Sequence, residues 1–191
     1  MRTSTVERKT KETEIKIKLN IDGDGKTNID TSIRFLDHLL CELAVHSYID
    51  LEIKAKGDLS HHIVEDVAIT LGEALRQALG DRNGIKRFGY SIVPMDDALA
   101  LVSIDLVTRQ FSDIELDLWS GQIEDMASED IPHFIETLAN SLKFTLHVNV
   151  LRGTNNHHKV EAVFKGLALS LSEAWEVDRK RKGIPSSKGK M

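Results

Sequence analysis

The chain has 191 residues, of which 41% are hydrophobic and 29% are charged, and its formal net charge is −5. This composition is ordinary for a soluble globular protein, and the negative charge argues against a nucleic-acid surface, which normally shows a dominant basic face. We expect neither a signal peptide nor a membrane span, because no apolar run approaches the roughly 20 residues that a membrane helix needs. Cys41 is the only cysteine, which excludes an internal disulfide framework and fits a reducing cytoplasm best.

The first half of the chain changes between two hydrophobic periods. Ile15, Ile17 and Leu19 alternate with charged residues, which is the period of a half-buried strand. The turn at 22–25 has a DxDG pattern, but it lacks the later acidic ligand and the flanking helices of an EF-hand. In chain order, the sequence predicts strands at 3–9 and 12–20, a helix at 35–45, a strand at 48–55 and a helix at 61–79.

A second series of the same elements follows Gly84. The sequence predicts strands at 90–95, 98–107 and 112–118, a helix at 130–143, a strand at 145–151 and a helix at 157–179. The last residues, KGIPSSKGKM, have the composition of a disordered tail. We therefore expect an α+β fold with an internal duplication, in which helices from both halves pack between two sheets. The expected parts are a first repeat at 1–84, a second repeat at 85–182 and a tail at 183–191.

The motif HHxxE occurs twice, and each copy begins a predicted helix. The copies start at His61 and His157, 96 positions apart. The first His and the Glu lie four residues apart and share one helix face, whereas the second His is rotated by about 100° and points elsewhere. Another histidine precedes each copy, by 23 positions in one half and 24 in the other. The full set is His38, His61, His62, Glu65, His133, His157, His158 and Glu161.

These eight side chains predict a metal site. They divide evenly into three His and one Glu for each of two metals, a mixed ligation that suits Mn²⁺, Fe²⁺ or Zn²⁺ better than Ca²⁺ or Mg²⁺. Octahedral ions would keep two positions for substrate or water, which favours manganese or iron over tetrahedral zinc. A lone His beside an apolar face is more often a core or surface residue, but two copies in register outweigh that interpretation. His46 and His147 have no counterpart in the other half and stay outside the ligand set.

The chain resembles the imidazoleglycerol-phosphate dehydratase family of histidine biosynthesis. The residues that carry the resemblance are the two HHxxE helices, the FLDH segment at 35–38 and the PSSKG segment at 185–189, within a similarity from about Glu7 to Gly189. It implies a fold like domain 2 of ribosomal protein S5, two Mn²⁺ ions per active site, and a 24-subunit homo-oligomer with active sites at subunit interfaces. It also implies a hydro-lyase that converts D-erythro-imidazole glycerol phosphate into imidazole acetol phosphate and water.

The resemblance further implies a reaction route and roles for individual residues. The metal-bound imidazolate would expel the C3 hydroxyl to give a diazafulvene-like intermediate, and a carboxylate base would then remove the C2 proton. That base would be Glu12, and Asp96 would hold the imidazole or the diol, with Asp97 as the less favoured alternative. Substrate or phosphate would be bound by His46, Arg87, Arg109, Lys165, Ser186 and Lys188, which would make the tail an ordered clamp.

Two departures from the family pattern and two rival functions stay open. The loop before His61 is shorter than is common in the family and lacks an extra His, and Glu42 stands where a Gln is usual. One rival is an assembly protein whose histidines cross-link subunits through metal without catalysis, in which case Glu12 would be idle. The other is an RNA-binding module, since small α+β repeats also occur in ribosomal proteins.

Overall fold

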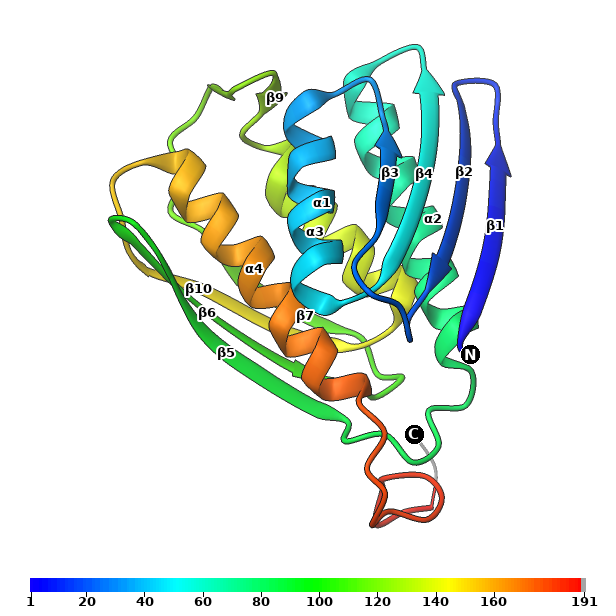
Figure 1. Cartoon of the computed structure of the whole chain (residues 1–191). Helices are drawn as coiled ribbons and strands as arrows, with labels where there is room; N and C mark the ends of the chain where they lie inside the picture. Colours follow the sequence, from blue (N-terminus) through cyan, green and yellow to red (C-terminus); the bar gives the residue numbers. More distant parts are fainter. Residues whose placement is uncertain (190–191) are drawn as a thin grey trace.

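A computed structural model describes residues 1–189 and contains two four-stranded sheets that enclose four helices (Figure 1). In the first sheet the strands lie in the order β1 (Thr3–Lys9), β2 (Thr13–Asn20), β4 (Asp50–Gly57) and β3 (Thr27–Asp30). In the second the order is β5 (Phe88–Met95), β6 (Ala98–Asp105), β10 (Thr145–Arg152) and β7 (Phe111–Glu115). In each sheet the first three strands pair antiparallel and the last pairs parallel with its neighbour, which confirms the predicted duplication.

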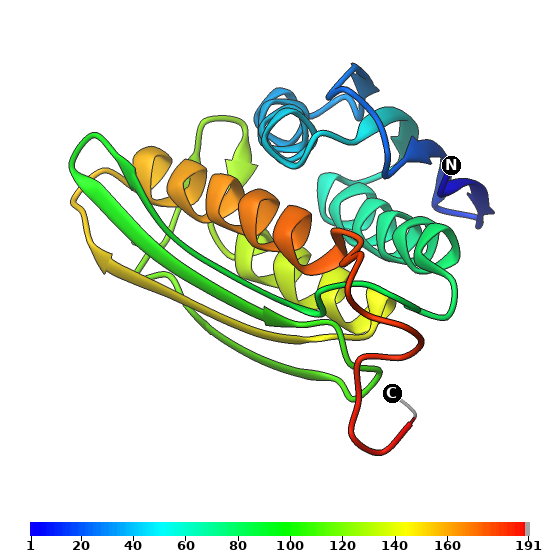
Figure 2. The ribbon, with the colours of Figure 1, turned by 60° about the horizontal axis from the view of Figure 1, so that its bottom comes forward.

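The helices pair across the two halves rather than within them. They are α1 (Arg34–Ser47), α2 (Ser60–Leu79), α3 (Asp130–Leu142) and α4 (Asn156–Trp175). Helix α2 packs on α3 and on the first sheet, and α4 packs on α1 and on the second sheet. Figure 2 shows this layer of helices between the sheets, where their buried side chains form one hydrophobic core that includes Leu71, Phe134 and Phe164. This pairing places the start of each HHxxE helix beside a helix from the other half.

Four elements, β3, β8, β9 and α4, differ most from the predictions. Strand β3 is short and lies at a sheet edge with most of its residues exposed, so it has no hydrophobic period to detect. A small hairpin, β8 (Gln122–Ile123) and β9 (Met126–Ala127), precedes α3 and has no counterpart in the first half. Helix α4 ends at Trp175, short of the predicted 179, because Val177 forms a β-bridge with Ile85 instead. None of the helices among residues 1–189 has the length and apolarity that a membrane span requires.

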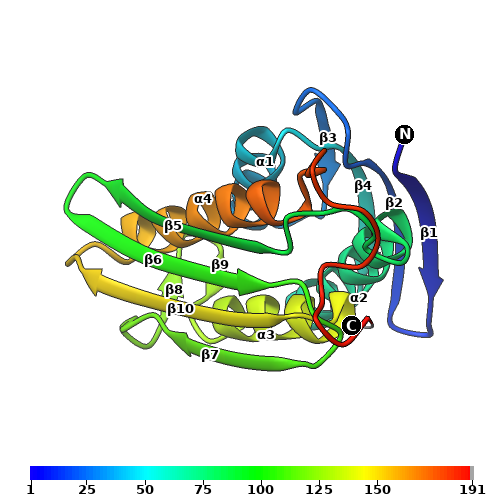
Figure 3. The same cartoon turned by 90° about the horizontal axis from the view of Figure 1, so that it is seen from below.

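The described part of the tail, 183–189, packs against the segment that joins the two halves. The backbone N–H of Gly84 donates to the carbonyl of Gly183 (2.9 Å), and Arg87 Nη1 donates to the carbonyl of Pro185 (2.9 Å). Pro185 is buried. Composition alone was therefore misleading, because these contacts fix a segment that lacks any apolar period. Figure 3 views the molecule from the end where the tail crosses it.

Candidate metal and substrate site

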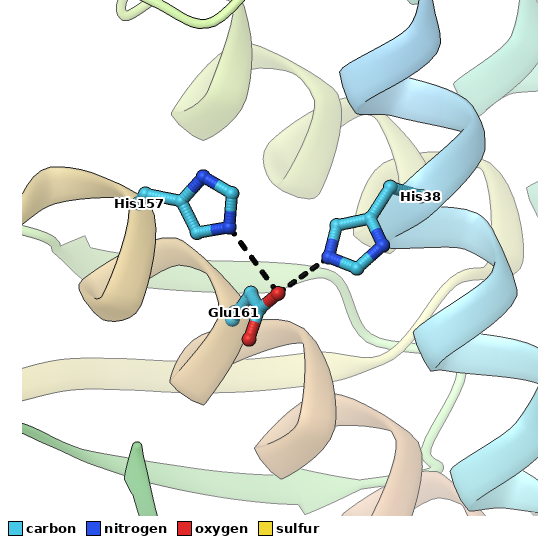
Figure 4. Close-up of side chains that lie close together, drawn as sticks. All are labelled: His38, His157 and Glu161. Carbon is cyan, nitrogen blue, oxygen red and sulfur yellow. Dashed lines mark hydrogen bonds and ion pairs between the residues drawn. The ribbon is translucent and has the colours of Figure 1, made fainter. Parts of the chain in front are cut away.

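Two clusters of three side chains form where the helices of the two halves begin. The α1/α4 cluster contains His38, His157 and Glu161 (Figure 4), and the α2/α3 cluster contains His61, Glu65 and His133. In each cluster one ligand atom from every residue lies within 4.8 Å of the others. Each cluster joins the first His and the Glu of one motif to the upstream histidine of the other half. Six of the eight predicted ligands are thus brought together in a way that spacing along the sequence does not reveal.

In the α1/α4 cluster the carboxylate of Glu161 is the central group. Its Oε1 accepts a hydrogen bond from His38 and lies 3.3 Å from His157 Nε2, while its Oε2 accepts from Lys165 Nζ (3.0 Å). Burial alone raises the pKa of Glu161, but the hydrogen bonds from His38 and Lys165 outweigh it and hold the pKa at about 2. The carboxylate is therefore ionised, as a metal ligand must be. A pocket of about 530 Å³ opens beside the cluster and is also lined by Phe35, Arg34, Glu124 and Asp125.

The α2/α3 cluster contains a histidine nitrogen without a hydrogen-bond partner. His133 Nε2 is buried and makes no hydrogen bond within residues 1–189, and Glu65 Oε1 lies 3.7 Å away. The rings of His133 and His61 stack with their centroids 5.1 Å apart. A buried polar atom without a partner is costly, but a metal ion between these three side chains would satisfy it. The residues of this cluster therefore fit a metal.

A carboxylate orients every histidine of the two motifs through its Nδ1 atom. Such partners fix the tautomer and direct Nε2 toward a metal. The four pairs are His61–Asp130 (2.6 Å), His62–Asp58 (2.8 Å), His157–Glu124 (3.1 Å) and His158–Asp97 (2.7 Å). The sequence analysis missed all four roles. Only Asp58, four residues before His62 at the start of α2, could have been found from helical spacing, because the other three pairs span 33 to 69 positions.

The second histidine of each motif lies outside both clusters, beside a predicted catalytic carboxylate. His62 Nδ1 is 3.9 Å from Glu12 Oε2, and His158 Nε2 is 3.4 Å from Asp96 Oδ2. Glu12 lies in the β1–β2 turn and Asp96 in the matching β5–β6 turn. The duplicated fold therefore places one exposed acid beside each of these histidines. Asp97 has a different task, because it accepts hydrogen bonds from the start of α4.

Two of the carboxylates that orient the histidines, Asp97 and Asp58, are held in their charged forms. The backbone N–H of Thr154, together with His158 and the N–H of Asn155, holds the pKa of Asp97 well below its usual range. The pKa of Asp58 is also lowered, chiefly by its hydrogen bond with His62. Ionised carboxylates on Nδ1 make the imidazoles more basic and thus better ligands.

Most of the predicted phosphate-binding residues lie at the opposite end of the molecule from the clusters. The N–H of Arg87 bonds to the carbonyl of Ala174, in the last turn of α4, and a helix rise of 1.5 Å per residue puts that turn about 25 Å from His157. The Arg87 guanidinium binds Asp105 through two hydrogen bonds (2.6 and 2.8 Å) as well as the tail. The carbonyl of Arg109 accepts from Thr145, which pairs with Asp105 across the sheet, so Arg109 lies near the same end. Ser186 and Lys188 belong to the tail, which crosses this end of the molecule (Figure 3).

Lys165 is the exception, because it lies next to the α1/α4 cluster. Glu42 Oε2 is 3.6 Å from Lys165 Nζ and 2.9 Å from His46 Nε2. The residue that departs from the family pattern therefore lies between two predicted substrate-binding groups. Lys165 is flanked by the carboxylates of Glu42 and Glu161, and although burial opposes it, these neighbours raise the pKa of Lys165.

Comparisons with known proteins give one consistent result. A family model described as imidazoleglycerol-phosphate dehydratase matches residues 31–171. The chain is 50% identical to the imidazoleglycerol-phosphate dehydratase of Methanothermobacter thermautotrophicus, over 100% of this chain and 98% of that protein. It is 48% identical to the protein of the same name from Desulforudis audaxviator, over 99% and 97% of the two chains. The crystal structure of IGPD from Pyrococcus furiosus in complex with (S)-C348 superposes with a TM-score of 0.85 at 39% identity, covering 97% of this chain and 100% of that chain.

Proposed function

The chain belongs to the imidazoleglycerol-phosphate dehydratase family, and from this premise we propose that it dehydrates D-erythro-imidazole glycerol phosphate to imidazole acetol phosphate in histidine biosynthesis. The observation that carries the proposal is the pair of His–Glu clusters, each of which supplies donors for one metal. Glu12 and Asp96 lie beside the second histidines of the two motifs. We place the reaction in the cytoplasm, where the single free cysteine would remain reduced.

We propose two Mn²⁺ ions per active site, with iron or zinc as substitutes. Each cluster offers three donors, and His62 or His158 from a neighbouring copy would supply the fourth. The partnerless nitrogen of His133 and the ionised carboxylate of Glu161 support this assignment. When bound, the metals supply Lewis acidity and a template for the imidazole ring.

The protein groups would divide the proton transfer and the orientation of the substrate between them. The proposed route is loss of the C3 hydroxyl from the imidazolate form of the substrate, through a diazafulvene-like intermediate, before loss of the C2 proton. Glu12 would accept that proton, since its carboxylate is exposed and lies beside His62. Asp96, which lies beside His158, would hold the imidazole or the diol.

The phosphate would be bound where two or more copies of the chain meet. We propose His46, Arg87, Arg109, Lys165, Ser186 and Lys188 for substrate and phosphate, and one chain alone does not bring them all to its own clusters. A 24-subunit assembly with shared sites would unite them. An apolar surface is present for such contacts, because Phe88, Tyr90 and Ile92 are exposed on edge strand β5. The first sheet instead exposes ion pairs such as Lys18–Glu52.

Replacing the proposed base tests this function most directly. Protein purified without added metal and then loaded with Mn²⁺ should turn over the substrate, and Glu12→Gln should lower kcat by about 10²- to 10⁴-fold. Metal content and particle mass should not change, because Glu12 is exposed and belongs to neither cluster. Full turnover by Glu12→Gln would refute the base assignment.

Turnover, particle mass and RNA binding of the wild-type protein separate the rival functions. A wild-type protein that binds metal and assembles without turnover would point to the assembly protein. Salt-sensitive RNA binding would point to the RNA-binding module.

A further inference from the structure

The exposed turn that carries Glu12 is attached to a buried carboxylate on helix α2. Asp66 is only 7% exposed, and its two oxygens accept from Thr13 Oγ1 and from Arg8 Nε (2.7 Å). Thr13 is itself buried at the start of β2, one residue after Glu12. A buried charge is retained at low cost only when it is fully paired, so this contact is costly to disrupt.

A continuous series of hydrogen bonds connects Asp66 to the backbone of Glu12, and the donor and acceptor of each bond can be assigned. The carboxylate oxygens of Asp66 accept from Thr13 and from Arg8, so the Thr13 hydroxyl uses its single proton in this bond. Thr13 Oγ1 must then accept from the Thr10 hydroxyl (3.2 Å). Thr10 Oγ1 in turn accepts from the backbone N–H groups of Glu12 (3.1 Å) and Thr13 (3.0 Å). On the other side of the turn, the carbonyl of Glu12 accepts from the N–H of Asp58 (3.0 Å).

Two consecutive residues of helix α2 therefore have different tasks: one is a proposed metal ligand, and the other holds the turn that carries Glu12. Glu65 belongs to the α2/α3 cluster, and Asp66 starts the chain of hydrogen bonds that ends at Glu12. The second half has no such link, because Ala162 stands at the position that matches Asp66. In the second half the carboxylate belongs to the turn instead of the helix. Asp97 in the β5–β6 turn accepts from the N–H groups of Thr154 and Asn155, just before α4.

We propose that Asp66, acting through Thr13 and Thr10, is a positioning residue for Glu12. The inference rests on the proposed function, in which Glu12 removes a substrate proton. A general base must be held close to its productive position, and a base on an exposed turn needs support from a rigid element. Asp66 provides that support through Thr13, from the same helix that carries the proposed metal ligands His61 and Glu65.

The test compares two substitutions of one hydroxyl group. Thr13→Val keeps the size and shape of the side chain but removes the donor to Asp66, and it should lower kcat by about 10- to 100-fold with little change in KM. Thr13→Ser keeps the hydroxyl and should restore most of kcat. Asp66→Asn should act like Thr13→Val, but its buried position makes misfolding a risk, so the threonine pair carries the test. Bound Mn²⁺ and particle mass should match the wild type in both threonine variants.

Two controls distinguish positioning from a general loss of structure. In a Glu12→Gln background, Thr13→Val should cause no further loss, because both changes act on the same proton transfer. Hydrogen exchange of the backbone amides in residues 9–14 should accelerate in Thr13→Val, while exchange in residues 60–66 stays unchanged. The positioning role would be overturned if Thr13→Val had the kcat of the wild type. It would also be overturned if Thr13→Val lowered kcat as much in the Glu12→Gln background as it does in the wild type. If the wild type itself shows no turnover, the proposed function fails. If amide exchange in residues 9–14 is unchanged in Thr13→Val, the inference that Asp66 and Thr13 hold the turn fails, whatever the turnover.

Discussion

In the α1/α4 cluster the ring of His157 packs against Phe35, with centroids 5.0 Å apart, whereas in the α2/α3 cluster His61 forms a 2.6 Å hydrogen bond with Asp130. Phe35 and Asp130 occupy matching positions, each three residues before the upstream histidine. His157 obtains its own carboxylate from Glu124, in the β8–β9 turn that the first half lacks. The duplication has therefore preserved the candidate ligands of the two clusters but not the groups that support them.

The glutamates of the two clusters differ in the same way. Glu161 is buried and is bonded to Lys165, four residues along α4. Glu65 is half-buried, and the residue four positions after it is Ile69, which has no charge. Among residues 1–189, Lys165 thus pairs with the carboxylate of one cluster, and the carboxylate of the other has no lysine or arginine partner. Two clusters with matching residues should consequently respond differently to substitution.

The largest predicted effect is common to both clusters and comes from removing the metal. Each cluster has three donors within the chain, and the two remaining histidines, His62 and His158, lie outside them. Chelation should therefore abolish turnover and split the proposed 24-subunit assembly into smaller particles, and readdition of Mn²⁺ should restore both. Particle mass by light scattering checks this. An unchanged mass after complete metal removal would show that the fourth ligands do not come from neighbouring copies.

Substituting the carboxylates that orient the histidines should separate the two clusters. Asp130 is buried and its bond to His61 is short, whereas Glu124 is exposed and 3.1 Å from His157. Asp130→Asn should weaken Mn²⁺ binding at one of the two proposed sites by about 10- to 100-fold, and Glu124→Gln should weaken it less than about 10-fold at the other. Equilibrium dialysis with Mn²⁺ measures both affinities. Equal losses would mean that burial of the supporting carboxylate does not matter.

The residues of the two clusters could be predicted as candidate metal ligands from the sequence because their signal is local. A His and a Glu four residues apart share a helix face wherever the helix lies, and the second copy of the motif repeats the evidence. Which histidine joins which motif is decided by the packing of α1 on α4 and of α2 on α3, contacts between residues far apart in the chain. For that reason the sequence left open the pairing of His38 with His157, and it did not reveal Asp130 or Glu124.

The errors in the fold have related causes. Strand β3 and the β8–β9 hairpin are too short and too exposed to show a hydrophobic period. The tail is ordered by single contacts, such as Arg87 to the carbonyl of Pro185, which composition does not encode. The roles of Glu12, Asp96 and the phosphate-binding set came from family resemblance, because isolated charged residues have no distinguishing pattern.

The smallest effect concerns Lys165, the cation that pairs with Glu161 beside the α1/α4 cluster. Lys165→Met would leave the Glu161 carboxylate buried with less compensation, so the metal-free protein should lose about 1–2 kcal/mol of unfolding free energy at neutral pH. In the wild type the pKa of Glu161 is lowered from 4.5 to about 2, so the stability that this carboxylate contributes is present above about pH 4.5 and is lost as the pH falls toward 2. The substitution raises that pKa, and the difference between the two proteins should therefore disappear across the same range. Urea unfolding from pH 7 to pH 2 measures it, with Ile69→Met as the matched control in the other half. A difference that persisted at pH 2 would assign the role of Lys165 to packing rather than to charge, and the two clusters would then be electrostatically more alike than their geometry indicates.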